Sequence, residues 1–171
     1  DNQFDTPTGK GQLFAAPWRA PAETPDADFP LVLCTVREVG HYSCRSMTGN
    51  CAALQSLADE PGRVQMNPAD AEKLGISEGQ LVWVRSRRGK VITRASISER
   101  INAGAVYMTY QWWIGACNEL TQDNLDPISK TPETKYCAVQ LEAIEDQRWA
   151  EDFAASAYQS MKSRLINAVN V

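Results

Sequence analysis

The spacing of short β-branched and apolar segments constrains the fold of this chain more than any other feature. Strands are predicted at residues 31–36, 81–84, 91–97, 105–108 and 136–141. The segments 81–84 and 91–97 flank Arg87-Arg88-Gly89-Lys90, which predicts a β-hairpin with glycine in its turn. Short strands at this spacing favour a small closed or half-closed barrel over residues 31–143.

Three helices are predicted around these strands. The first covers Asn50 to Asp59. The second begins at Asn67, a good N-cap followed by proline, and ends at Gly75. The third begins after Asp146 and carries an apolar residue at every fourth position, namely Trp149, Phe153, Ala157, Met161 and Leu165. Such a stripe requires a surface to pack against.

The first 30 residues differ in composition from the rest. They contain five of the nine prolines, which predicts an extended segment laid along the domain. We therefore divide the chain into an extended lead-in (1–30), a barrel (31–143) and a C-terminal helix (144–171). Because the chain begins at Asp1 within a proline-rich stretch, we expect it to be a fragment of a longer protein.

Composition excludes several classes of protein. With 43% hydrophobic and 22% charged residues, the chain can form a real core. No apolar run approaches the roughly 20 residues of a membrane helix. The net charge of −4 argues against nucleic acid as a partner, and we interpret the basic run 85–90 as charge that keeps a hairpin edge soluble. The five cysteines match neither a zinc site nor a disulfide framework, so free thiols and a reducing compartment are expected.

Residues 37–46 follow a buried strand and contain most of the functional chemistry. Arg37 can donate two hydrogen bonds to a phosphate or a heterocycle, and Gly40 permits close backbone approach. His41 and Ser43 can donate to ring nitrogens or phosphate oxygens. From the residues alone, a ligand-binding loop and an ordinary polar loop are about equally favoured. Nucleophilic catalysis by Cys44 is not favoured, because no third group orients His41.

Two later segments also contain candidates. Tyr107 to Leu120 combines aromatic rings with amides, which suits a flat heterocycle. There we favour a ligand for Tyr110 and Asn118, and simple packing for Trp112 and Trp113. Lys135 precedes a strand and could face a phosphate, although a solvated surface lysine is the commoner case.

Taken together, these segments resemble one family. They are Thr35 to Ser43, Asn67 to Ile76, Gly79 to Gly89, Tyr110 to Trp113 and Asn118 to Lys135. They resemble the carboxy-terminal dinucleotide-binding domain of molybdopterin oxidoreductases, and within that family the formate dehydrogenases of the formate hydrogenlyase type.

The resemblance implies a six-stranded double-psi β-barrel with peripheral helices. It also implies a bis-molybdopterin guanine dinucleotide cofactor, with molybdenum or tungsten, that oxidises formate to carbon dioxide. Electrons would leave through a 4Fe-4S cluster in other domains. Carried over by position, the cofactor-binding residues would be Arg37, Glu38, Gly40, His41, Ser43, Tyr110, Asn118 and Lys135. The resemblance places no catalytic residue or metal ligand in this chain.

Partners and location also follow only from the resemblance. The expected partners are the remaining domains of the parent chain and, beyond them, electron-transfer and hydrogenase subunits, in the cytoplasm and without membrane insertion. The chain alone would be inactive. One alternative is a stand-alone barrel that serves as a binding or scaffold module. Another is a domain of a related molybdopterin oxidoreductase, such as a membrane-attached periplasmic formate dehydrogenase or a relative of nitrate reductase.

Overall fold

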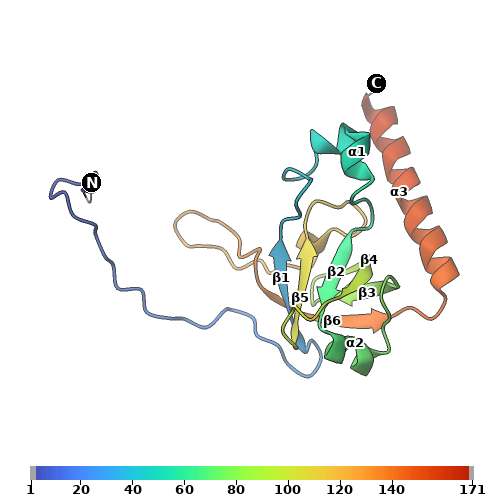
Figure 1. Cartoon of the computed structure of the whole chain (residues 1–171), viewed down its shortest axis with the longest axis horizontal. Helices are drawn as coiled ribbons and strands as arrows, with labels where there is room; N and C mark the ends of the chain where they lie inside the picture. The colour runs from blue at the N-terminus through green and yellow to red at the C-terminus, as the bar shows by residue number, and fades with distance from the viewer. Residues whose placement is uncertain (1–2, 170–171) are drawn as a thin grey trace.

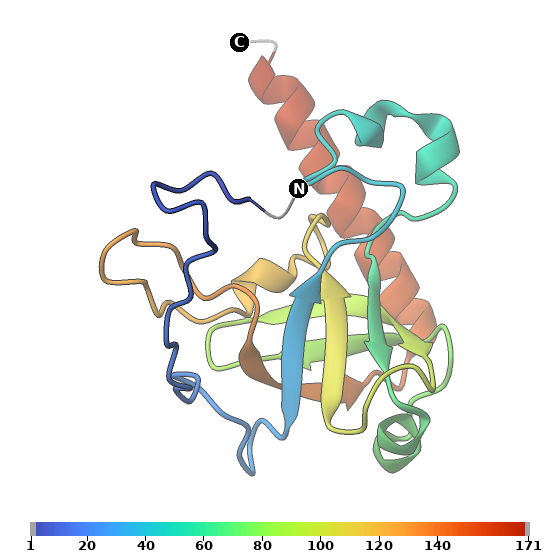
Figure 2. The same cartoon turned by 60° about the vertical axis from the view of Figure 1, so that its left-hand side comes forward.

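A computed structural model describes residues 3–169 and places six strands in a closed barrel (Figures 1 and 2). The strands are β1 (Leu31–Val36), β2 (Arg63–Met66), β3 (Leu81–Arg85), β4 (Lys90–Ile97), β5 (Ala105–Thr109) and β6 (Cys137–Ala143). Their order around the barrel is β1-β5-β2-β4-β3-β6. The pairs β1–β5 and β2–β4 are parallel, and the other neighbours are antiparallel. The closed, mainly β barrel with a C-terminal helix confirms the predicted fold class.

Strand β2 is the one strand of the barrel that the sequence pattern did not indicate. Its four residues alternate between exposed and buried, with Arg63 and Gln65 outside and Val64 and Met66 fully buried. The segment is short and half polar, so its period-two pattern resembles a loop. Pairing with β4 and β5 on both sides fixes it as a strand, which is a tertiary effect that local propensity does not contain.

The barrel interior is filled by aliphatic side chains that alternate inward along each strand. Leu33, Val64, Val84, Val106 and Val139 are all fully buried in one cluster. By the usual coefficient of about 25 cal/mol per Å² of apolar surface, each such side chain contributes roughly 1.5–3 kcal/mol to folding. The ends of the strands, rather than the barrel interior, are therefore where the chain can bind a ligand.

The helices follow the sequence prediction unevenly. Helix α2 (Pro68–Leu74) has Asn67 as its N-cap and Gly75 as its C-cap in the left-handed conformation, as predicted. The helix predicted from Asn50 to Asp59 is wrong in extent, because only η1 (Thr48–Asn50) and α1 (Ala52–Gln55) form there. Neither short helix buries a residue. Without a buried face, a longer helix gains little from packing.

Helix α3 (Gln147–Val169) covers one side of the barrel and extends beyond it (Figure 1). Its buried contacts come from Ala150 and Ala154, which pack with Leu81 and Ile92. The larger residues of the predicted stripe lie at the edge of this contact, where Trp149 and Phe153 touch Trp83. Small side chains face the sheet because they let the helix approach closely. Within residues 3–169, no helix has the length and apolar character needed to cross a membrane.

The lead-in lies against the barrel only over its last residues. Leu13, Phe14 and Trp18 are 79–96% exposed, and this part of the segment extends away from the barrel (Figure 1). Nearer β1, the Glu23 carboxylate accepts two hydrogen bonds from Arg88, at 2.6 and 2.8 Å, and a third from the backbone N–H of Ala138. The basic hairpin tip thus holds the lead-in.

The hydrogen bonds between Glu23 and Arg88 predict that the stability of the fold depends on pH. The hydrogen bonds from Arg88 lower the pKa of Glu23 below its usual 4.5. A carboxyl whose pKa is lower in the folded than in the unfolded protein stabilises the fold at pH values above its unfolded pKa. This contribution is lost as the pH falls through the folded pKa. We expect Glu23→Gln to lower the free energy of unfolding by about 1–3 kcal/mol at pH 7. The difference from wild type should shrink below about pH 4.5.

Urea unfolding of both proteins between pH 3 and pH 8 measures this difference. The exposed Glu145 provides a matched control, and Glu145→Gln should leave the curve unchanged. A Glu23→Gln deficit that is constant over the whole pH range would contradict the assignment.

Candidate functional site

The site is built on the paired ends of β1 and β5. These strands run parallel, with Val36 opposite Thr109. Arg37 and Tyr110 follow those two residues directly, so both leave the barrel at the same end and side by side. The parallel pairing therefore joins two segments that are more than 70 residues apart in the chain.

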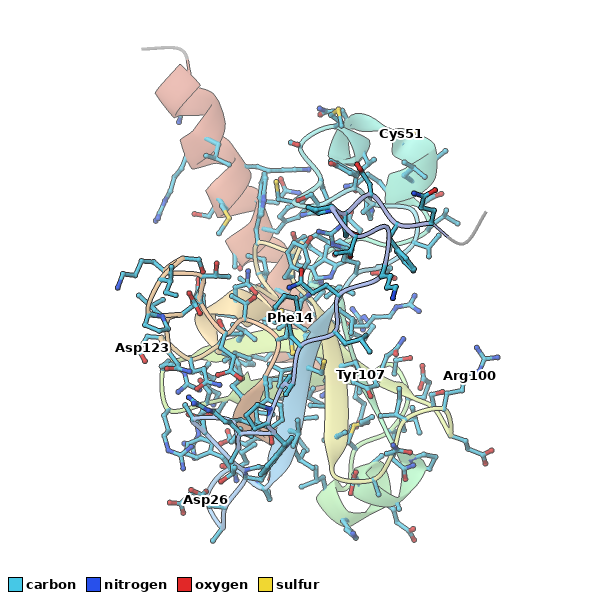
Figure 3. The ribbon with its side chains drawn as sticks, turned by 90° about the vertical axis from the view of Figure 1, so that its left-hand side faces the viewer. Phe14, Asp26, Cys51, Arg100, Tyr107 and Asp123 are labelled. Atoms are coloured by element: carbon cyan, nitrogen blue, oxygen red, sulfur yellow. The ribbon has the colours of Figure 1, made fainter. Side chains whose placement is uncertain are left out.

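A pocket of about 240 Å³ opens at this end, between β1, β5 and β2. Its polar lining consists of Arg37, Glu38, Arg63, Gln65, Tyr107 and Thr109, and we call it the arginine pocket. Figure 3 shows Tyr107 on the outer face of β5, where it stands opposite Gln65 of β2. Two arginines and one glutamate thus line one small opening.

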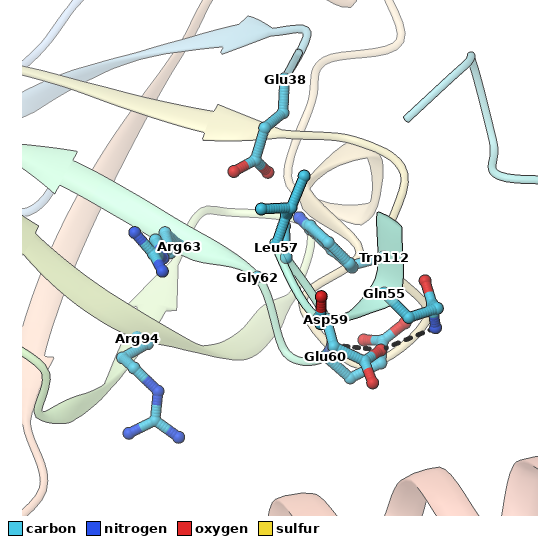
Figure 4. A pocket seen from close by; sticks show the side chains of 11 residues that line it. Glu38, Gln55, Leu57, Asp59, Glu60, Gly62, Arg63, Arg94 and Trp112 are labelled. Carbon is cyan, nitrogen blue, oxygen red and sulfur yellow. Dashed lines mark hydrogen bonds between the residues drawn. The ribbon is translucent and has the colours of Figure 1, made fainter. Parts of the chain in front are cut away.

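Glu38 has an unsatisfied oxygen. Its Oε2 is buried and has no hydrogen-bond partner among residues 3–169. Figure 4 shows the carboxylate pointing into the same opening as Arg63, in a neighbouring cavity of about 240 Å³. A buried acceptor without a donor costs about 1–3 kcal/mol, so this oxygen is suited to accept a hydrogen bond from an N–H or O–H group.

His41 is held inside the loop rather than presented to the pocket. Its Nε2 donates to the carbonyl of Ala58 at 2.8 Å, and its Nδ1 lies 3.1 Å from Oγ1 of Thr48. That hydroxyl also accepts the N–H of Tyr42. The ring meets Trp112 edge-on at 5.7 Å. Both ring nitrogens of His41 are therefore used inside the loop, and the ring shapes the loop.

Arg45 and Glu60 form the strongest connection in the site. Arg45 is 6% exposed, donates to the carbonyl of Gln111 at 2.9 Å, and pairs with Glu60. Glu60 in turn accepts the backbone N–H groups of Trp113 and Ile114 at 2.7 and 3.0 Å. This buried pair fastens the loop after β1 to the segment after β5.

Aromatic contacts strengthen the same connection. The guanidinium of Arg45 lies 4.5 Å from the ring centre of Trp112 and 5.8 Å from that of Trp113. Trp112 is 3% exposed and donates its indole N–H to Thr109. The packing role predicted for Trp112 therefore holds. Trp113 is 39% exposed and packs at its edge against Tyr158 of α3.

Tyr110 and Lys135 meet at the end of β1. The ammonium of Lys135 donates to the carbonyl of Thr35 at 3.1 Å and lies 5.6 Å from the ring centre of Tyr110. The hydroxyl of Thr35 donates to the carbonyl of Thr134 at 2.6 Å, which holds the segment before β6 in place. Tyr110 follows the residue paired with Val36 and so lies next to Arg37, but neither Tyr110 nor Lys135 lines the arginine pocket.

Two predicted positions, Asn118 and Ser43, differ from the rest, and Gly115 nearby is constrained by packing. Asn118 is exposed on η2 (Cys117–Glu119), which packs near the β3–β4 hairpin and does not line the arginine pocket. Ser43 is partly buried and has a left-handed backbone with φ of 48°. Gly115 does permit a close approach, but to the carbonyl oxygen of Pro61, which a Cβ would meet at 2.0 Å.

The thiols are free, as predicted, and two of them are deeply buried. Burial raises the pKa of Cys117 to about 12 and that of Cys137 to about 11. Both remain protonated at neutral pH and are poor nucleophiles. Cys44 is exposed and lies outside the arginine pocket, so nothing in its position supports catalysis.

Sequence reasoning missed Arg45, Glu60 and Arg63. Arg45 and Glu60 act through a contact between two loops, and no local spacing encodes that contact. Arg63 was missed together with its strand. A buried arginine between two tryptophans is a typical arrangement, so the Trp112-Trp113 pair was the one signal that pointed to a cation nearby.

The fold is a closed barrel with a polar pocket where β1 and β5 end. Residues 31–138 match the family described as molybdopterin dinucleotide binding domain, and the chain belongs to this family. The resemblance found in the sequence is therefore confirmed.

Curated relatives agree with this assignment. The chain is 61% identical to formate dehydrogenase H of Escherichia coli (strain K12) over 166 residues, which is 97% of this chain and 23% of that protein. It is 41% identical over 143 residues to the F420-dependent formate dehydrogenase subunit alpha of Methanocaldococcus jannaschii, covering 84% of this chain and 21% of that protein. The chain thus spans less than a quarter of the length of these relatives.

A solved structure supports the fold. Acetylene hydratase from Pelobacter acetylenicus superposes with a TM-score of 0.64 over 84% of this chain and 24% of that protein. At 18% sequence identity, the match bears on the fold alone.

Proposed function

We propose that this chain is the cofactor-binding domain of a formate dehydrogenase. It holds bis-molybdopterin guanine dinucleotide, which when bound supplies the two-electron chemistry that converts formate to carbon dioxide. The 4Fe-4S cluster and the metal ligand belong to other domains of a longer parent chain. As the resemblance in the sequence implies, the parent would act in the cytoplasm as part of a formate hydrogenlyase with electron-transfer and hydrogenase subunits.

The arginine pocket is the observation that carries this proposal. Arg37 and Arg63, which form no ion pair in residues 3–169, line it together with Glu38, one of whose carboxylate oxygens lacks a donor. A nucleotide carries the matching groups, because its phosphates are anionic and its sugar and base donate O–H and N–H. The residues present therefore fit the cofactor. Glu38, Arg37, Tyr110 and Lys135 would contact it, while His41 positions the loop.

Replacing Arg37 tests the role of the pocket. In the full-length enzyme, we expect Arg37→Ala to weaken cofactor binding by about 1.5–3 kcal/mol, because a charge-assisted fork is lost. Molybdenum and guanine content per purified protein measures the effect. The exposed Arg148 on α3 lies outside the pocket, so Arg148→Ala serves as the control. Equal cofactor content in Arg37→Ala and wild type would contradict the proposal.

The chain alone should not oxidise formate. Among residues 3–169, no three His, Cys, Asp or Glu side chains gather as a metal site. We expect the purified 171-residue chain to show no formate oxidation, even after incubation with the isolated cofactor. A dye-reduction assay with a buffer control measures this. Turnover above that control would contradict the proposal that formate oxidation requires the other domains.

A further inference from the structure

Arg63 lines the arginine pocket, and no carboxylate among residues 3–169 pairs with it. It begins β2 and lies opposite Arg94 of the parallel strand β4. Arg94 is fully engaged, since its guanidinium bonds Glu151 at 2.7 and 3.0 Å and the carbonyl of Gly79 at 2.8 Å. The guanidinium of Arg63 makes no ion pair and no hydrogen bond within residues 3–169. Arg63 on β2 thus has no ionic partner among these residues, whereas the charge of Arg94 on β4 is compensated by Glu151.

Arg63 shares its pocket with a second arginine. Arg63 and Arg37 both line the arginine pocket, from β2 and from the end of β1, and strand β5 lies between them. Two guanidinium groups that face one cavity repel each other unless an anion lies between them. Each can bind phosphate oxygens through two parallel N–H donors.

The other residues that line the arginine pocket restrict the chemistry of its ligand further. The free oxygen of Glu38 would repel a bare phosphate but accepts hydrogen bonds from a donor beside it. A nucleotide places sugar hydroxyls next to its phosphates, and a carboxylate is a common partner of those hydroxyls. Gln65 and Tyr107, opposite each other on β2 and β5, add an amide and a hydroxyl to the same wall.

We propose that Arg63 is a second phosphate-binding arginine of this domain. Together with Arg37 it holds the diphosphate of the bound dinucleotide, while Glu38 accepts a hydrogen bond from the adjoining sugar or base. The inference rests on the proposed function and adds β2 to a site that the sequence assigned only to the segments after β1 and β5 and before β6.

Three variants of the full-length enzyme test the proposal. Arg63→Gln removes the charge, and Arg63→Lys keeps the charge but lacks the two parallel N–H donors of a guanidinium. The control, Arg100→Gln, alters an exposed arginine outside the pocket (Figure 3). Guanine and molybdenum content and the rate of cofactor loss on dilution are measured for each. We expect Arg63→Gln to lose the cofactor at least about tenfold faster than wild type, as a lost charged hydrogen bond requires. Arg63→Lys should be intermediate, and Arg100→Gln should match wild type.

The outcomes separate this inference from the proposed function. Cofactor loss in Arg37→Ala but not in Arg63→Gln would overturn the role of Arg63 and leave the proposed function standing. No loss in either variant would overturn both. The side chain of Arg63 is exposed, so Arg63→Gln should unfold at the wild-type temperature. Arg63→Lys gives an independent measurement in a side chain of similar length.

Discussion

Replacing Arg45 with methionine should destabilise the fold more than any other single charge removal in this chain. The side chains of Arg45 and Glu60 are 5% and 3% exposed and compensate each other's charge, and Arg45 also lies 3.5 Å from the half-exposed carboxylate of Asp59. Removing one partner leaves the other buried and unpaired, which typically costs about 3–5 kcal/mol. In a chain of this size, that corresponds to a fall in Tm of roughly 6–20 °C.

Thermal and urea unfolding measure this effect, and the chain contains a matched control. Arg94 and Glu151 also form a bidentate ion pair, but their side chains are 34% and 52% exposed. We expect Glu151→Gln to cost less than about 1 kcal/mol. An Arg45→Met variant as stable as Glu151→Gln would show that the buried pair does not hold the two loops together.

A single methyl group at Gly62 should be nearly as damaging. A Cβ there would lie 2.1 Å from both Cδ1 and Nε1 of Trp112, whose ring is buried. The residue also has φ of 71°, which side chains adopt at a cost of about 1–2 kcal/mol. Overpacking adds typically 1–3 kcal/mol. We therefore expect Gly62→Ala to lower the free energy of unfolding by about 2–5 kcal/mol in total.

Gly75 separates the two causes. It has a similar φ of 64°, yet nothing lies within 4 Å of its Cβ position. Gly75→Ala should therefore cost only the backbone part, about 1–2 kcal/mol. Urea unfolding of both variants, with tryptophan fluorescence as the probe, measures the difference. Equal losses for the two variants would mean that Trp112 moves aside freely and does not fix the position of His41.

Elements that local sequence determines were predictable, whereas elements that depend on contacts between distant segments were not. Strands β1, β3, β4, β5 and β6 were predictable because each is apolar, β-branched and bounded by turn residues. Strand β2 was not, because only its neighbours make Arg63 to Met66 a strand. The same distinction applies to the site.

Within the site, residue chemistry was informative but orientation was not. Arg37 and Glu38 line a pocket at the end of a strand, where sequence reasoning placed the candidate ligand contacts. His41 was selected for its ring nitrogens, yet both are used inside the loop, by Thr48 and Ala58. Which way a polar side chain faces depends on partners up to 17 residues away, and no spacing rule contains that information.

The pairing of β1 also determines when the chain can fold during its synthesis. β1 is made first, but its two partners, β5 and β6, end at residues 109 and 143. One edge of β1 can pair with β5 once residue 109 has emerged from the ribosome, but the other edge has no complete partner until residue 143 has emerged. Open strand edges invite association with other chains, and long-range pairing slows folding. A nascent chain halted before β6 is therefore the species of this protein that most needs protection from aggregation.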